Sequence, residues 1–90
     1  MRLQPNYPRA YNNLANTLVS AGSREEAVAH YRTALQLDPR FVEAHLNLAS
    51  TLQQLGHLDD AAAHYKAALE LNPNLSAARA NWEQLRRAKR

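Results

Sequence analysis

Apolar residues recur at helical spacing along the first part of the chain. Four of them lie three or four residues apart, which places them on one face of a helix: Ala10, Leu14, Leu18 and Ala21. The pattern stops at Gly22, and glycine commonly follows the last residue of a helix. We therefore predict a first helix over residues 8–21.

A second apolar stripe follows after a short interval, again at helical spacing: Ala27, Tyr31, Ala34 and Leu35. Ser23 and Glu26 precede it with the spacing of a capping box, in which both side chains bond to free amide groups of the first turn. Pro39 disfavours helical geometry at the residue before it. The sequence therefore predicts a second helix over residues 24–37.

The pair of predicted helices returns in the next part of the chain. Residues 8–41 align without a gap with residues 42–75, and the identical pairs include Asn13/Asn47, Leu14/Leu48, Leu18/Leu52, Gly22/Gly56, Ala27/Ala61, Tyr31/Tyr65 and Pro39/Pro73. Repetition at this period is typical of helical solenoids. We predict further helices over residues 42–55, 58–71 and 75–88. Residues 1–7 align with the end of a repeat, and we interpret them as the tail of a preceding one.

The third segment, residues 76–90, keeps one apolar stripe, formed by Ala78, Trp82 and Leu85. The positions that face a partner helix within the earlier units are charged here: Arg79, Glu83 and Arg86. Such a helix is typical of the polar cap that ends a solenoid. The first helix has no such change, so we expect an uncovered N-terminal face with Met1, Leu3, Tyr7 and Tyr11.

The repeated pattern resembles the tetratricopeptide repeat family. In the first unit the family positions are held by Tyr11, Leu14, Ala15, Leu18, Gly22, Ala27, Tyr31, Ala34 and Pro39; in the second they are held by His45, Leu48, Ala49, Leu52, Gly56, Ala61, Tyr65, Ala68 and Pro73. The resemblance implies an all-α fold, a right-handed superhelical array of helix-turn-helix units. We expect two repeats, 8–41 and 42–75, followed by a capping helix over residues 76–90. It also implies protein–protein interaction and no enzymatic activity.

Three asparagines, Asn13, Asn47 and Asn81, occupy the same position of the three successive segments. Asn13 and Asn47 directly precede core leucines and so lie ~100° round the helix, toward the groove in this repeat geometry. An amide side chain has both a donor and an acceptor, which match one peptide unit of an extended chain. The stretches "AYNNLANTL" and "AHLNLASTL" resemble the repeats of the O-linked N-acetylglucosamine transferase array, whose asparagine ladder holds peptides. The alternative is that these asparagines bond only to neighbouring helices or loops.

The prediction is therefore a protein-interaction module that binds an extended peptide segment in its concave groove through an asparagine ladder. Further polar contacts are expected from the same helices: Asn12, Asn16, Arg9, Glu43, Ser50 and Gln84. Family members that clamp a C-terminal carboxylate need lysines and an arginine, whereas three of those positions hold Asn12, Ala77 and Asn81, so we reject a clamp. The competing hypothesis is a structural repeat fragment that self-associates through its uncovered N-terminal face.

Charge and composition limit the classes of partner and the cellular compartment that the sequence predicts. The net charge is +3, and the excess lies in the last twelve residues, at Arg79, Arg86, Arg87, Lys89 and Arg90. Cations favour a helix C-terminus, and aromatics other than Trp82 are missing from this stretch, so no nucleic-acid partner is predicted. No apolar run reaches the ~20 residues of a membrane span and no leader is recognisable. The absence of cysteine fits a reducing compartment, and we expect a cytoplasmic protein.

Chemistry of other kinds has little support in the sequence. His30 and His64 occupy equivalent positions one repeat apart, and we interpret the histidines as helix-surface residues rather than metal ligands. There is no glycine-rich phosphate loop and no recognisable catalytic arrangement. We expect neither a metal nor another cofactor.

Overall fold

The computed structural model describes residues 7–88, and five helices account for most of them. They are α1 (Pro8–Ser20), α2 (Arg24–Leu37), α3 (Val42–Gln54), α4 (Leu58–Leu71) and α5 (Ser76–Ala88). Every predicted helix is present, and each predicted end differs from the observed one by at most one residue. The expectations for Met1 and Leu3, and for Lys89 and Arg90, lie outside the described residues.

The turns inside the two helical hairpins are set by Gly22 and Gly56. Both have a positive φ, 87° and 86°, a left-handed conformation that glycine adopts without steric cost. The amide of Ser23 donates to the carbonyl of Leu18 at 2.8 Å, and the equivalent bond recurs one repeat later. This is the Schellman arrangement, which satisfies the last carbonyls of a helix and reverses the chain.

The predicted capping box at Ser23 is wrong. Ser23 does occupy the N-cap of α2, but its hydroxyl makes no capping hydrogen bond. Its ψ of 61° lies away from the extended conformation of most capping serines, because the residue also completes the turn that follows Gly22. Glu25 and Glu26 still lie in the first turn, where the helix dipole favours negative charge.

The turns between hairpins are also determined by residues close in the sequence. α2 ends at Leu37, directly before Asp38 and Pro39, as predicted. The carboxylate of Asp38 accepts the amide of Arg40 at 3.2 Å, which stabilises the turn. Asn72 and Asn74 form the same bond after α4, also at 3.2 Å.

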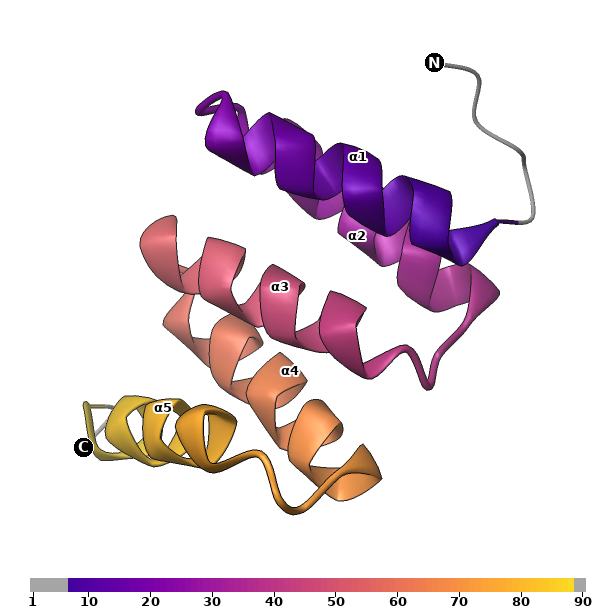
Figure 1. Ribbon diagram of the computed structural model, residues 1–90. Coiled ribbons are helices and arrows are strands. Elements are labelled where there is room, and N and C mark those ends of the chain that lie inside the picture. The colour runs from indigo at the N-terminus through magenta and orange to yellow at the C-terminus, as the bar shows by residue number, and fades with distance from the viewer. Residues whose placement is uncertain (1–6, 89–90) are drawn as a thin grey trace.

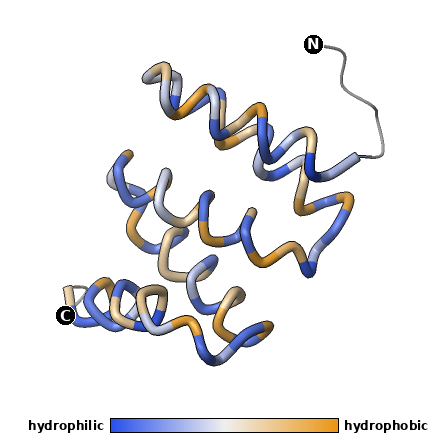
Figure 2. Tube along the Cα trace, in the orientation of Figure 1, coloured by the Kyte–Doolittle hydropathy of each residue, from blue (hydrophilic) through white to orange (hydrophobic). Residues whose placement is uncertain are grey.

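The hairpins are stacked one after the other, so the molecule is elongated, with extents of 43 × 26 × 17 Å. α1 packs on α2 and α3 on α4, while α2 contacts α3 and α5 packs on α4 (Figure 1). The first and last helices, α1 and α5, lie at opposite ends of the stack. Polar and apolar residues alternate along each helix, as expected for helices with one buried face (Figure 2).

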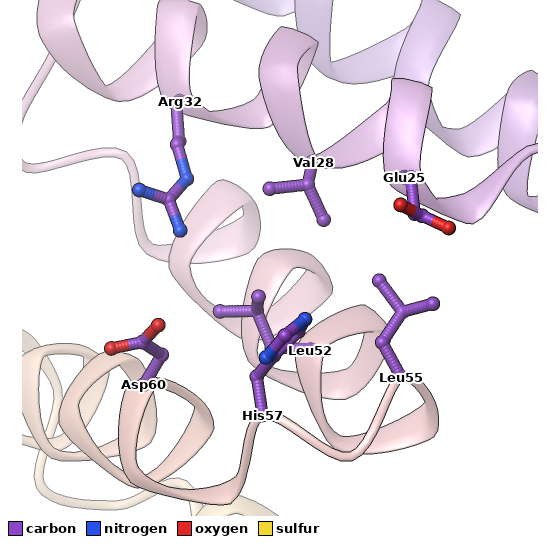
Figure 3. Close-up of a pocket in the computed structure, with 7 residues that line it drawn as sticks. All are labelled: Glu25, Val28, Arg32, Leu52, Leu55, His57 and Asp60. Atoms are coloured by element: carbon purple, nitrogen blue, oxygen red, sulfur yellow. The ribbon is translucent and has the colours of Figure 1, made fainter.

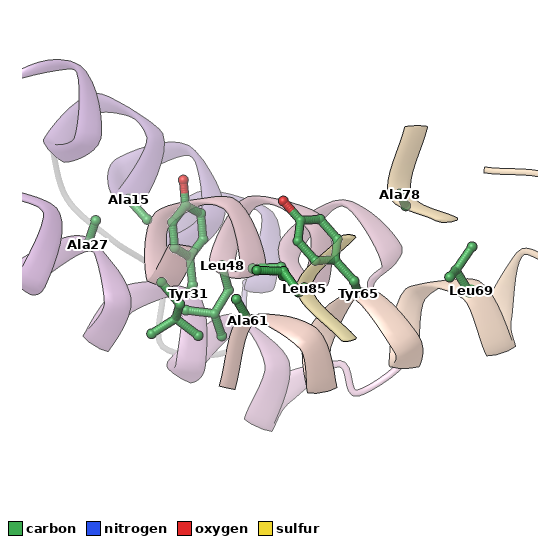
Figure 4. Packing of buried hydrophobic residues seen from close by; sticks show 11 residues of the cluster. Ala15, Ala27, Tyr31, Leu48, Ala61, Tyr65, Leu69, Ala78 and Leu85 are labelled. Atoms are coloured by element: carbon green, nitrogen blue, oxygen red, sulfur yellow. The ribbon is translucent and has the colours of Figure 1, made fainter. Parts of the chain in front are cut away.

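Small residues allow the helices to approach closely. Ala15, Ala27, Ala49 and Ala61 are fully buried, and the same core cluster contains larger side chains: Tyr31, Leu48, Leu52, Tyr65 and Leu85. Figure 4 shows part of this cluster. In the predicted core stripe of α2, Ala27, Tyr31 and Ala34 are buried and Leu35 is partly buried against the core. Ala21, the last residue of the stripe predicted for the first helix, is exposed, so that position was predicted wrongly.

The last helix presents one apolar face to the stack, as predicted. Ala78 and Leu85 are buried, and Trp82 is partly buried against the core. The Arg86 guanidinium lies over the Trp82 ring, 5.0 Å from its centroid, in a cation–π contact. The outward positions Arg79 and Arg86 are exposed.

The outer face of α1 is open, in contrast to the equivalent face of α3. Thr17 is exposed and Leu14 only half-buried, whereas their equivalents Thr51 and Leu48 are buried. Tyr7 is 57% exposed. Tyr11 is half-buried, in agreement with the expectation of a partly uncovered ring, and it stacks on His30 of α2, with 6.2 Å between the ring centroids.

The interpretation of the histidines as surface residues is wrong for His45. Its side chain is only 9% exposed, and its Nδ1 lies 3.1 Å from Nδ1 of His64 on α4. Its Nε2 lies 2.9 Å from the carbonyl oxygen of Pro39. The two histidines thus link α3, α4 and the preceding turn.

Candidate functional site

The three repeated asparagines lie on the first helix of each successive unit: Asn13 on α1, Asn47 on α3 and Asn81 on α5. Their surroundings differ, because Asn13 is exposed while Asn47 and Asn81 are half-buried. Asn13 and Asn47 share one local feature. The carbonyl of each accepts the hydroxyl of the threonine four residues on, at 3.2 Å from Thr17 and 2.8 Å from Thr51.

Asn47 is held by Asn12 of the preceding helix. The Nδ2 of Asn47 donates to Oδ1 of Asn12 at 3.2 Å, across the contact between α1 and α3. Asn12 is only 2% exposed, so it lies inside the packing rather than on the surface where the sequence placed it. The bond satisfies the buried oxygen of Asn12 and orients the amide of Asn47.

Tyr31 brings a hydroxyl to the same side of the stack. Its ring belongs to the core, and its hydroxyl donates to Oδ1 of Asn16 on α1. Burial raises the pKa of Tyr31 above its usual value, and hydrogen bonding to Thr51 partly offsets that rise. The group therefore stays protonated at neutral pH and acts as a hydrogen-bonding hydroxyl.

Tyr65 repeats this arrangement in the second unit. Its hydroxyl points to the same side as that of Tyr31 (Figure 4) and donates to Oε1 of Gln53 at 3.0 Å. Burial raises the pKa of Tyr65, while hydrogen bonding to Asn81 and Ser50 lowers it. Ser50 and Asn81, from α3 and α5, therefore meet around one tyrosine hydroxyl.

A hollow of about 480 Å³ lies between α3 and α5, next to this group of polar side chains. It is lined by Leu46, Ser50, Tyr65, Asn74, Leu75, Ser76, Ala77, Ala78 and Asn81. Two of the predicted site residues, Ser50 and Asn81, thus line the same depression, which combines apolar walls with uncharged hydrogen-bonding groups.

Family comparison agrees with this architecture. A family model described as TPR repeat matches residues 15–56, and one described as Tetratricopeptide repeat matches residues 42–75. Together they cover about two thirds of the chain. The chain belongs to the tetratricopeptide repeat family. A comparison with curated proteins gives no significant match.

Several solved structures share the fold. The first tetratricopeptide repeat domain of Spaghetti (RPAP3) bound to the HSP90 peptide SRMEEVD has a TM-score of 0.89 and 22% identity, over 94% of this chain and 68% of the other. MamA has a TM-score of 0.92 and 18% identity, over 97% and 51%. The Yersinia enterocolitica chaperone SycD in complex with a YopD peptide has a TM-score of 0.87 and 20% identity, over 94% and 70%.

The remaining predicted site residues of this tetratricopeptide repeat array are spread along its first helices. Arg9 on α1, Glu43 on α3 and Gln84 on α5 are all exposed. The structure therefore joins Asn12 to Asn47 by a hydrogen bond, and places Ser50 and Asn81 around one hollow, while these three residues stand on open surface.

Four residues near the site were not among the predicted site residues: Tyr31, Tyr65, Leu46 and Leu75. Tyr31 and Tyr65 were assigned to the core alone, although they recur at the same interval as the asparagines. Leu46 and Leu75 line the hollow but have no identical partner in the first repeat, which has Asn12 and Phe41 there. A comparison of the two repeats identifies the residues that they share. It gives no indication of the hollow, because Leu46 and Leu75 stand at positions where the repeats differ.

A second, smaller hollow of about 230 Å³ lies between α2 and the turn that joins α3 to α4 (Figure 3). Its apolar floor is Val28, Leu52 and Leu55. Arg32 and Asp60 point toward each other across it, and Glu25 and His57 complete the lining. Its charged lining residues have both signs, and none of the repeated asparagines lines it.

Residues 7–88 contain neither a cluster suited to a metal ion nor a helix suited to a membrane. No group of three or more His, Cys, Asp or Glu side chains in this region could hold a metal ion. None of the helices in this region is long and apolar enough to cross a membrane.

Proposed function

We propose that this chain is a protein-interaction module that holds an extended peptide along α1, α3 and α5, with Asn13, Asn47 and Asn81 bonded to the peptide backbone. The observation that carries the proposal is the state of Asn47, which is half-buried and oriented by Asn12. Peptide complexes of RPAP3 and SycD, which share the fold, support the class of ligand.

Asn47 retains hydrogen-bonding capacity after its bond to Asn12. An amide nitrogen has two hydrogens, of which one is directed to Asn12, and the amide oxygen is an acceptor. The second hydrogen and the oxygen match the carbonyl and N–H of one peptide unit. Asn12 is buried, so we assign it the role of positioning Asn47 rather than of contacting the peptide.

The three asparagines are not expected to contribute equally. Asn81 lies in a polar group with Ser50 and Tyr65, which favours a well-defined amide orientation. Asn13 is exposed, so solvent competes for its bonds and its contribution should be smaller. We propose that Asn16 and the exposed Arg9, Glu43 and Gln84 add peripheral polar contacts.

The peptide is expected to bind through an internal segment. Positions that carry lysine and arginine in carboxylate-clamping relatives hold Asn12, Ala77 and Asn81 here, and none of these has a positive charge. A free carboxylate would therefore gain no ionic partner there. Recognition of an uncharged backbone fits the amides and hydroxyls of this surface better.

Substitution of Asn47 tests the proposal, but the test must allow for Asn12. Asn47→Ala alone would leave the buried Asn12 oxygen without its donor, which costs stability by roughly 1–3 kcal/mol. We therefore compare Asn12→Leu with the double variant Asn12→Leu/Asn47→Ala. Leucine is the residue that the second repeat has at the equivalent position, Leu46.

The double variant should bind a peptide selected from a random display library about 1–3 kcal/mol more weakly than Asn12→Leu does, because one peptide unit loses both bonds. Asn13→Ala is the matched control and should lose less. N-methylation of the peptide backbone should weaken binding more than side-chain changes outside any selected anchor position. Calorimetry gives the affinities, and thermal unfolding shows whether both variants remain folded.

Equal affinities of the parent protein, Asn12→Leu and the double variant, with all three folded, would refute the asparagine ladder. The recurring asparagines would then be structural residues of the repeat. Failure of the parent protein to bind any peptide would refute the proposed function as a whole.

A second candidate function is self-association through α1. The observation that favours it is the open outer face of α1, where Thr17 and Leu14 remain accessible while their equivalents in α3 are covered by the preceding hairpin. A second copy is the partner that we propose for this face, with Tyr7 at its edge. A cytoplasmic location and the absence of nucleic-acid and membrane partners stay predictions.

A further inference from the structure

We propose that the hollow between α3 and α5 receives one uncharged apolar side chain of the bound peptide. The inference rests on the proposed peptide-binding function and adds to it a side-chain preference. An asparagine ladder bonds to backbone and discriminates little between side chains, so any sequence preference needs a separate pocket. The hollow next to Asn81 is placed to supply it.

The lining of the hollow determines the class of side chain. Its apolar part is made of Leu46, Leu75, Ala77 and Ala78, and none of the residues that line it is acidic, basic or a histidine. A charged side chain would lose water there without gaining an ionic partner, which is unfavourable. An aliphatic or aromatic side chain would bury apolar surface against these walls.

The polar part of the lining fits the backbone that carries such a side chain. Ser50, Tyr65 and Asn81 lie together, and the Tyr65 hydroxyl is held in place by Gln53 at 3.0 Å. These hydroxyl and amide groups can bond to a peptide unit while the apolar walls take its side chain. The volume of about 480 Å³ lies within the range of small-molecule sites.

The first repeat gives an internal comparison, because its equivalent positions have different residues. Asn12 stands at the position of Leu46, Phe41 at that of Leu75, and Glu43 at that of Ala77. In the first repeat the Asn12 side chain is buried and bonded to Asn47, so that position carries an amide rather than an apolar wall. The apolar combination that lines the hollow is therefore particular to the second repeat.

The probes for the test are N-acetyl amino-acid amides, which contain one side chain with a peptide unit on each side. The leucine, phenylalanine, alanine, glutamate and lysine amides are titrated into the ¹⁵N-labelled full chain. Binding is followed by chemical-shift changes in two-dimensional NMR spectra. The leucine amide should shift the amide signals of Leu46, Ser50, Ala77 and Asn81, and it should bind roughly five- to tenfold more tightly than the alanine amide.

Ala77→Glu is the decisive variant, because Ala77 is exposed and its replacement should leave folding intact. It places at the rim the carboxylate that the first repeat has at Glu43. The shifts produced by the leucine amide should fall at least fivefold in this variant. Ala80→Glu is the matched control on the same helix, because Ala80 is exposed and does not line the hollow, and this variant should bind the leucine amide as the parent does.

Equal shifts with the leucine, glutamate and lysine amides would overturn the inference, as would an unchanged response of Ala77→Glu. Neither outcome would refute the asparagine ladder if the Asn12→Leu/Asn47→Ala variant still binds the peptide more weakly than the parent protein does. Conversely, binding of the leucine amide at this hollow, together with unchanged peptide affinity of the double variant, would support the pocket and refute the ladder.

Discussion

Lowering the pH from 7.5 to 5.5 should destabilise the fold through the paired histidines His45 and His64. Nε2 of His45 lies 2.9 Å from the Pro39 carbonyl, which only an N–H can approach, so this nitrogen carries the proton of the neutral ring. Its Nδ1 is then an acceptor, and Nδ1 of His64, 3.1 Å away, must be the donor.

The surroundings of His64 make its protonation in the folded chain unfavourable. Burial lowers the pKa of His64 below its usual value, and electrostatic interaction with His45 and Arg32 lowers it further, while Asp60 on its own helix raises it in part. The unfolded chain therefore takes up a proton at a higher pH than the folded chain does. Stability is complete above the unfolded pKa of about 6.5 and decreases as the pH falls below it.

The size of the effect has a fixed upper limit. One proton that the unfolded state binds and the folded state does not changes the free energy of unfolding by about 1.4 kcal/mol per pH unit. Solvent reaches part of the half-buried His64 ring and screens its charges, so the expected slope is a fraction of this limit.

Urea unfolding at half-unit pH steps between 7.5 and 5.5 measures this slope. The matched variant is His45→Tyr, which gives the second repeat the tyrosine–histidine pair that the first already has in Tyr11 and His30, whose rings stack. His64→Gln, which removes the titrating ring, is a second variant. Both should flatten the slope.

Parallel pH profiles for the parent protein and both variants would refute this reasoning, as would a parent whose stability increases on acidification. The absolute stability of His45→Tyr is not the readout. Replacing His45 also removes the bond to the Pro39 carbonyl, and that loss is independent of pH in this range.

Three further predictions concern stability and assembly. Trp82→Ala should lower the free energy of unfolding by about 2–3 kcal/mol in urea denaturation, below the cost for a fully buried tryptophan, because Trp82 is only partly buried; a loss under about 1 kcal/mol would contradict its packing role. Gly22→Ala should cost roughly 1–2 kcal/mol in the same assay, although no atom lies within 4 Å of the added carbon, since φ is 87°. Tyr7→Glu/Thr17→Glu should reduce self-association measured by sedimentation at several concentrations, and a strictly monomeric parent at high micromolar concentration would refute the second candidate function.

The helices could be predicted from the sequence because local chemistry marks each of their ends. Gly22 supplies the left-handed residue of a Schellman turn, and Pro39 ends α2 without reference to any distant residue. Since the same signals occur again one repeat later, at Gly56 and Pro73, each boundary was indicated twice. Ser23 shows the limit of this reasoning, because its conformation is decided jointly by the turn before it and the helix after it.

The site was less predictable because its contacts join residues from different units. The bond between Asn12 and Asn47 joins two repeats and depends on how α1 packs against α3. The pairing of His45 with His64 likewise depends on the packing of α3 against α4. Residue type and spacing placed Asn47 on the correct helix, but its hydrogen-bonding partner follows only from tertiary structure.

The three asparagines stand in three different environments, and this difference gives the proposed groove a direction. At the α1 end, Asn13 is exposed; in the middle, Asn47 is held by Asn12; at the α5 end, Asn81 adjoins the apolar hollow. A ladder of identical rungs would let a peptide slide by one repeat, because backbone is the same everywhere. A single apolar pocket at one end removes that freedom, since a shifted peptide would leave its apolar side chain in water. We therefore expect the departures of the second repeat from the first, more than their identities, to set the register of a bound peptide.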